Sequence, residues 1–320
     1  MSMYLELSRP DGDVSRWEKV LKRLTLLNRS YPLTAHQCSH IDFQRKLSNT
    51  NSKERTDEIN NSEEIYETVK TTLMDQGVVF FGGYAVSLYS QYMPKHLRKQ
   101  LEKIPDFDVL SEEPLTIAQI VKERLQDIGI KNVKIIKRPA VGEIIAPHYE
   151  IRVGKDVVAF IYEPLACHSY NIIKQQGYEI KVATIDTMLS FYLAFLYANR
   201  PYYDKDRILC MSKYLFEVQE KNRLEQKGLL KRFSINCMGH QETVEEMRAA
   251  KTEKFSELKN KKKDPEYEEW FLRYRPLDAK ELNNDKENKK LDQTRQTKHI
   301  KKNGTNKTRK TNKKKRGLFF

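Results

Sequence analysis

A short apolar run that ends in a pair of glycines constrains the fold of this chain most. Residues 78–81 (VVFF) are β-branched or aromatic, which predicts a buried strand. Gly82 and Gly83 end that strand, and residues 84–93 resume helical spacing. Glycines let a backbone approach an anion closely, and the following helix points free N–H groups at it. The segment is consistent with a phosphate site, although an isolated glycine pair is more often a tight strand-to-helix turn.

A second predicted strand carries two carboxylates. Residues 104–110 (IPDFDVL) alternate, so Asp106 and Asp108 share one face of the strand. Two like charges at this spacing resist ionisation unless a cation compensates them, and burying them uncompensated is costly. Mg²⁺ prefers such oxygen ligands and is often shared with substrate phosphates. The pair therefore predicts a metal site, with a surface turn or an arginine-paired edge strand as the alternative.

The periodicity along the rest of the chain predicts a mixed-sheet α+β core followed by a helical domain. We expect an N-terminal helix and loop over residues 1–59, the core over 60–183 and the helical domain over 184–277. The longest apolar run, near Met188–Ala198, is too short to span a bilayer, so no membrane partner is expected. The other predicted elements are strands at 132–137, 144–153, 157–162 and 178–183, helices at 15–28, 62–76, 115–128, 186–199, 204–223, 240–262 and 265–272, and a loop at 46–62.

Positive charge is concentrated at the end of the chain. The sequence of 320 residues has a net charge of +14, and residues 279–320 contribute fifteen Lys or Arg against four acids. A segment this polar cannot bury enough apolar surface to offset its chain entropy, so residues 278–320 are predicted to form a disordered basic tail. Such a tail is suited to RNA phosphates, and a solubilising or localisation role is the alternative.

The cysteines predict neither a disulfide framework nor a strong metal site. They are far apart and form no CxxC pair, which favours a reducing, intracellular compartment. His36, Cys38 and His40 could form a zinc site only with Cys237 and His240, and coincidence is the better explanation, because structural zinc sites use close paired spacings. The four cysteines are Cys38, Cys167, Cys210 and Cys237.

Together, FFGGYAVSLY and IPDFDVL resemble the signature of the polymerase-β-like nucleotidyltransferase superfamily. Longer segments are similar to the poly(A) polymerase catalytic subunit of large cytoplasmic DNA viruses, particularly the mimivirus-like group, over about residues 14–277. The segments that carry this second resemblance include RWEKVLKRLTLLNRSYPL, YEPLACHSYNII, IDTMLSFYLAFLYANRPYY and EYEEWFLRYRPL.

This resemblance implies an enzyme that transfers AMP from ATP to RNA 3′ ends without a template, in polyadenylation of viral mRNA. Gly82 and Gly83 would bind the triphosphate, and Asp106 and Asp108 would hold Mg²⁺ or Mn²⁺ for two-metal catalysis. The implied partners are the RNA 3′ end, ATP and a second copy or a processivity subunit. The implied location is the host cytoplasm, with packaging in the virion as a further option.

The sequence departs from the superfamily pattern at one position. A third carboxylate is expected on a strand beside Asp108, most naturally at position 160, which is Phe160. The nearest acids are Glu150, Asp156 and Glu163, and none matches the pattern. Either one of these acids substitutes and the protein is active, or the chain is a degenerate homologue that acts as an RNA-binding or partner subunit.

Two neighbouring tyrosines offer a further candidate contact. Tyr202 and Tyr203 follow an apolar helix and could stack on adenine or on an RNA base. An aromatic pair in the core is the more common arrangement.

Overall fold

The computed structural model describes several segments of the chain between Ser2 and Phe271. The predicted tail at 278–320, the candidate ligands His36 and His40, and residues 46–54 of the predicted loop lie outside the described residues, and the domain boundaries stay predictions. The described residues are 2–7, 14–33, 38, 55–93 and 106–271.

In this described part, eight strands form one mixed sheet in the order β3-β4-β5-β2-β1-β7-β6-β8. β1 is parallel to β7 and β2 is parallel to β5, while the other neighbours are antiparallel. The predicted fold class, a mixed sheet with a helical segment after it, is confirmed. The strands are β1 (Val79–Phe80), β2 (Phe107–Leu110), β3 (Val133–Arg138), β4 (His148–Val153), β5 (Asp156–Tyr162), β6 (His168–Gln175), β7 (Tyr178–Ala183) and β8 (Cys237–Met238).

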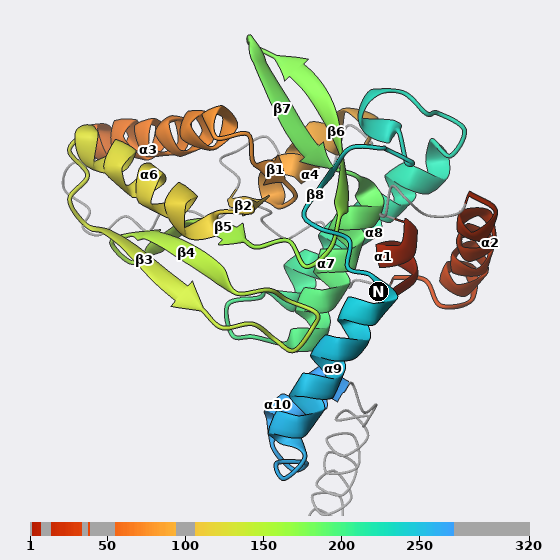
Figure 1. Cartoon of the computed structure of the whole chain (residues 1–320). Coiled ribbons are helices and arrows are strands. Elements are labelled where there is room, and N and C mark those ends of the chain that lie inside the picture. The colour runs from red at the N-terminus through yellow and green to blue at the C-terminus, as the bar shows by residue number, and fades with distance from the viewer. Residues whose placement is uncertain (1, 8–13, 34–37, 39–54, 94–105, 272–320) are drawn as a thin grey trace, which may run out of the picture. The chain divides into compact units, whose positions relative to one another are not determined.

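Helices cover both faces of the central strands. α3 and α6 contact each other on one side, as Figure 1 shows, and α7 and α8 pack together on the other. No helix among the described residues is long and apolar enough to cross a membrane. The helices are α1 (Ser2–Leu7), α2 (Val14–Ser30), α3 (Arg55–Asp75), α4 (Gly83–Tyr89), α6 (Pro114–Asp127), α7 (Ile185–Ala198), α8 (Lys205–Lys221), α9 (Val244–Leu258) and α10 (Pro265–Phe271), with short 3-10 turns η2 (Ser90–Tyr92) and η3 (Gly228–Leu230).

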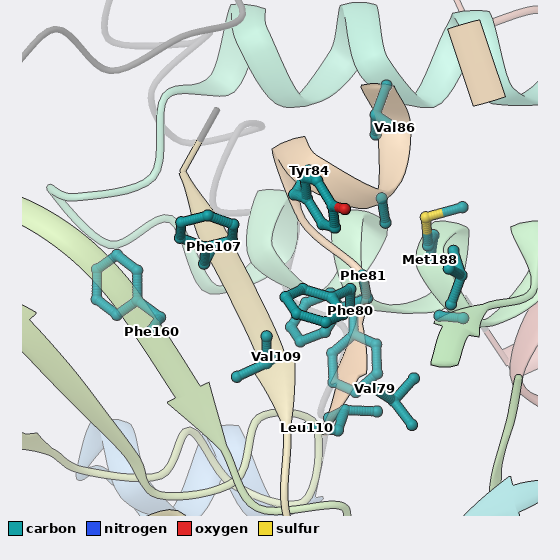
Figure 2. Close-up of a cluster of buried hydrophobic side chains, with 14 of the residues drawn as sticks. Val79, Phe80, Phe81, Tyr84, Val86, Phe107, Val109, Leu110, Phe160 and Met188 are labelled. Carbon is teal, nitrogen blue, oxygen red and sulfur yellow. The ribbon is translucent and has the colours of Figure 1, made fainter. Parts of the chain in front are cut away.

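Aromatic side chains on both sides of the sheet show that one face of β2 packs against α3 and that the opposite face meets α7 and α8. Phe107 is buried and stacks on Tyr66 of α3, with ring centroids 5.1 Å apart. On the other face, the Tyr192 hydroxyl of α7 donates a 2.7 Å hydrogen bond to the Phe81 carbonyl at the end of β1. Figure 2 shows Phe107 on β2 beside the aromatic residues of β1 and α4. Because side chains alternate along a strand, Asp106 and Asp108 face α7 and α8.

The start of α3 and the strand β6 were both missed, because each is rich in polar residues. α3 begins at Arg55 within the predicted loop, and β6 was not predicted. The first turns of α3 are polar and give no apolar period. In β6, His168, Ser169 and Asn171 are buried polar residues, so hydrophobic alternation is absent. Asn171 Nδ2 donates to the Lys231 carbonyl at 2.8 Å, which compensates its burial.

The prediction that the cysteines stay unpaired was also wrong. Cys38 is bonded to Cys210, with Cα atoms 5.6 Å apart, and Cys167 to Cys237, with Cα atoms 5.2 Å apart. The partners are 172 and 70 residues apart in sequence, so no local spacing could reveal them. Cysteine spacing therefore gives no support for a reducing compartment, and Cys38 and Cys237 belong to different pairs, so they do not form the considered zinc site.

A buried ion pair holds α7 to the segment after α8. Arg232 donates to Asp186 from Nε and Nη2, both at 2.7 Å. Asp186 is fully buried and Arg232 is 7% exposed. A buried charge that loses its partner is strongly destabilising, so each of the two residues requires the other.

We expect Asp186→Ala to lower the free energy of unfolding by about 3–5 kcal/mol, because Arg232 would keep a buried charge without a counter-ion. Urea denaturation measures the change. The matched control is Glu179→Ala, which removes the partner of Lys174 in an exposed pair and should cost less than about 1 kcal/mol. Equal losses in the two variants would contradict the assigned role of the buried pair.

Candidate functional site

The glycine turn and the acidic strand meet in space. The Phe81 and Gly82 amides both donate to the Asp108 carbonyl, at 2.9 and 3.2 Å, and the Tyr84 amide donates to the Asp106 carbonyl at 3.2 Å. A Cβ atom built on Gly82 would lie 2.1 Å from Asp108 Oδ2. Glycine is therefore required at position 82 because the Asp108 side chain fills the space that a Cβ would take.

Asp106 lies just before β2 and is held by an arginine of α8. Both guanidinium Nη atoms of Arg207 contact the two Asp106 oxygens, with Nη1 to Oδ2 at 3.1 Å. Asp106 is 4% exposed and Arg207 is 8% exposed. Burial alone would lower the pKa of Arg207, but the charge and hydrogen bonds of Asp106, with the charge of Asp108, raise it above its ordinary value. Arg207 thus supplies a fixed positive charge to Asp106.

α8 begins in a way that fixes where Arg207 lies. The side chain of Asp204 caps the helix and accepts a 3.0 Å hydrogen bond from the Arg207 amide. A capping carboxylate satisfies one of the free N–H groups of the first turn. Asp204 therefore orients the first turn of α8, and Arg207 reaches across to the end of β2.

Strand register places Phe160 where a third carboxylate is expected. Asp108 pairs with Phe160 on β5, and Phe160 pairs with Glu150 on β4, so the three side chains share one face of the sheet. The buried Glu150 lies one strand beyond Phe160 and contacts Arg138, at 2.6 Å, and Arg152. Glu150, the candidate for the third carboxylate on this face, is thus separated from Asp108 by the Phe160 ring and bound to two arginines.

The other two candidate acids lie at the ends of β5. Asp156 begins the strand and pairs with Val153 near the hairpin turn, whereas Asp108 is in register with Phe160. Glu163 is exposed just after the strand. Neither takes the place of the missing carboxylate, and within the described ranges no three His, Cys, Asp or Glu side chains are grouped to hold a metal ion.

A pocket lies between the strand end that carries Asp106 and Asp108 and the helices α7 and α8. It has an empty volume of about 340 Å³, which includes open solvent. The predicted stacking residues form part of its wall: Tyr202 stacks on Phe160 at 5.9 Å between centroids, and Tyr203 on Phe195 at 4.4 Å. Arg138 lies over the Tyr202 ring, 5.1 Å from its centroid. The residues that line the pocket are Asp106, Asp108, Phe160, Tyr192, Phe195, Tyr202, Tyr203, Asp204, Arg207, Ile208 and Met211.

These residues do not fit the two-metal site that the sequence resemblance implies. Both oxygens of Asp106 are engaged by Arg207, and Phe160 replaces an oxygen ligand with a ring. A metal cation at Asp106 would have to displace Arg207, because the guanidinium is bonded to both carboxylate oxygens and its positive charge would repel the metal. The structure brings Gly82, Asp106 and Asp108 together, and their roles with nucleotide and metal stay predictions.

Comparison with known proteins gives a fold neighbour but no sequence family. No family model matches the sequence, and no curated protein matches it. The structure is similar to the crystal structure of the Megavirus polyadenylate synthase, with a TM-score of 0.58 and 15% sequence identity. The match covers 80% of this chain and 52% of the other, so this chain spans about half the length of that protein.

The likeness establishes the class of fold. The chain shares its mixed-sheet fold with that polyadenylate synthase, and a mixed sheet is the fold class that the sequence predicted. At this identity the likeness extends to the fold and not to the chemistry of the site. Arg207 was missed by sequence reasoning, since no local pattern links residues 101 positions apart. The arginines that contact Glu150, Arg138 and Arg152, were missed as well.

A buried histidine lies behind the pocket wall. His148 is fully buried, stacks on Tyr162 at 4.4 Å, and its Nδ1–H donates to the Ala146 carbonyl at 3.1 Å. Its Nε2 is buried with no hydrogen-bond partner. Burial lowers the pKa of His148 to about 4, with nearby Arg138 also lowering it, while the Ala146 hydrogen bond and Glu150 act in the opposite direction.

We expect the protein to lose stability as the pH falls from about 6.5 to about 4. The unfolded chain takes up a proton on His148 near its ordinary pKa of 6.5, whereas the folded chain does so only near 4. The free energy of unfolding should drop by up to about 3 kcal/mol from this group across that window. Urea denaturation at several pH values measures it.

The control for this pH dependence is His148→Asn, whose amide can keep the donor to Ala146 but does not titrate. Its unfolding free energy should fall less steeply than that of the wild-type protein between pH 6.5 and 4. Parallel curves would contradict the assignment to His148.

We expect Gly82→Ala to destabilise the protein by about 1–3 kcal/mol, because the added methyl group overlaps the Asp108 side chain. In the double variant Gly82→Ala/Asp108→Gly the overlapping atoms are gone. Its loss of unfolding free energy should be smaller than the sum of the two single losses. Strict additivity in denaturant unfolding would show that the two residues do not contact each other.

Proposed function

We propose that this chain is a catalytically degenerate nucleotidyltransferase homologue that acts as an RNA-binding subunit in polyadenylation. The observation that carries this proposal is the register of Phe160 beside Asp108, at the position of the expected third carboxylate. That carboxylate normally helps to position a metal near the attacking 3′-hydroxyl and to remove its proton. Its replacement by a ring should abolish group transfer more than it affects binding.

The charge balance of the site supports the same conclusion. In a two-metal mechanism, divalent ions compensate the carboxylates and the phosphates together. Here Arg207 compensates Asp106 from within the protein, and Arg138 and Arg152 compensate Glu150. The negative charges of Asp106 and Glu150 are thus compensated by arginine side chains of α8, β3 and β4.

An active polyadenylate polymerase is the second candidate. The contact between Gly82 and Asp108 favours it, as does the fold shared with a polyadenylate synthase. Activity would require Arg207 to leave Asp106 so that ATP and Mg²⁺ or Mn²⁺ could bind, and another acid to replace the missing one. The two candidates differ in whether primer is extended.

We expect the purified protein to bind an oligo(A) primer without extending it when labelled ATP and Mg²⁺ or Mn²⁺ are supplied. Gel electrophoresis measures extension and fluorescence anisotropy measures binding. Asp108→Asn, which removes one acidic charge, should bind the primer within about twofold of wild type.

Extension by the wild-type protein that Asp108→Asn abolishes would overturn the degenerate assignment and establish the polymerase. A protein that neither extends nor binds the primer would remove RNA binding from the proposed function.

A further inference from the structure

Arg207 lies where a metal ion bound by the acidic strand would have to lie. Its guanidinium contacts both oxygens of Asp106, with Nη1 to Oδ2 at 3.1 Å. The side chain of Asp106 is 1% exposed and that of Arg207 is 10% exposed, so water screens this contact little. The charge of Asp108 also raises the pKa of Arg207, so the guanidinium is within electrostatic range of both carboxylates.

The backbone that carries Arg207 is held by contacts outside the ion pair. The side chain of Asp204 caps α8 and accepts a 3.0 Å hydrogen bond from the Arg207 amide. The loop before this cap is attached to α10, because Arg200 Nη2 donates to Glu269 Oε1 at 3.0 Å. The start of α8 is thus fixed independently of the contact with Asp106, and it keeps the guanidinium beside that carboxylate.

The pocket at this site carries more negative than positive charge. Asp106, Asp108 and Asp204 line it, and Arg207 is the only cationic side chain in its described lining. Neighbouring carboxylates favour a cation between them, and divalent metal ions prefer carboxylate oxygens. The charge of Arg207 therefore decides whether this pocket attracts a metal ion.

We propose that Arg207 is a built-in counter-ion that excludes divalent metal ions from Asp106 and Asp108. Loss of its charge would convert this end of β2 into a metal-binding site. A residue of α8, and not the acidic strand itself, thus determines which cation the acids accept. The inference rests on the proposed function in treating the site as one without metal ions, and it adds the residue that keeps them out.

Isothermal titration calorimetry with Mn²⁺ alone, without nucleotide or RNA, tests this exclusion. We expect no saturable binding to the wild-type protein at millimolar Mn²⁺. Arg207→Ala should bind Mn²⁺ at least about a hundredfold more tightly than that limit, because a positive charge next to Asp106 no longer repels the metal. The double variant Asp106→Asn/Arg207→Ala should lose this binding. Added methylguanidinium should weaken the binding of Mn²⁺ to Arg207→Ala, because it competes for the place that the side chain has left.

Thermal unfolding gives a second measurement. Arg207→Ala leaves the buried Asp106 without a counter-ion, so in EDTA it should unfold at a lower temperature than the wild-type protein. Mn²⁺ should raise the melting temperature of this variant and leave that of the wild-type protein unchanged. If the variant is unfolded in EDTA, Mn²⁺ should restore its folding, as measured by circular dichroism.

The matched control is Arg232→Ala, which breaks the other buried arginine–aspartate pair, at Asp186. Neither residue of that pair lines the pocket beside Asp108. This control should lose stability as well, but Mn²⁺ should not raise its melting temperature.

Saturable binding of Mn²⁺ to the wild-type protein that Asp106→Asn abolishes would overturn the proposal. So would a folded Arg207→Ala protein that binds Mn²⁺ no more tightly than the wild-type protein does, or an unfolded one that Mn²⁺ does not refold. Equal stabilisation of Arg232→Ala by Mn²⁺ would also count against it. Failure of the proposed function is a separate result, because it is read from primer extension with ATP and these titrations contain neither ATP nor primer.

Discussion

The bidentate contact between Arg207 and Asp106 joins the sheet to the helices that follow it. Asp106 precedes β2 and is buried under α8, where a carboxylate without compensation would be costly. Arg207 removes that cost and ties the first turn of α8 to the edge of the sheet. The packing of α7 and α8 over the face of Asp106 and Asp108 is compatible with their charges because this pair is present.

The same solution recurs elsewhere in the fold. Asp186 is paired with Arg232, and Glu150 is paired with Arg138 and Arg152. Together with Asp106, three buried acids are therefore compensated by arginines. Arginine suits this role because its charge persists when buried and its planar fork matches a carboxylate. The fold thus holds Asp106, Glu150 and Asp186 in its interior with their charges compensated by arginine side chains.

Local sequence patterns predicted those parts of the site that lie within a single strand or turn. Strand alternation put Asp106 and Asp108 on one face. The resemblance to the superfamily, and not a local pattern, put position 160 on the strand beside them, and the register of Phe160 with Asp108 confirms that position. The shared face of Asp106 and Asp108 could be predicted because alternation along a strand is a short-range property. The Arg207 contact and the two cysteine pairs depend on segments that meet only in the folded chain, and β6 was missed because its buried residues are polar.

α8 carries two buried polar side chains at opposite ends, Arg207 near its first turn and Gln219 near its last. A helix of 17 residues transmits displacement along its axis because its backbone hydrogen bonds resist stretching. Any motion that withdrew Arg207 from Asp106 by sliding this helix would therefore also shift Gln219. The bond from Cys210, three residues after Arg207 on the same helix, to Cys38 would oppose such sliding, so it helps to keep Arg207 against Asp106.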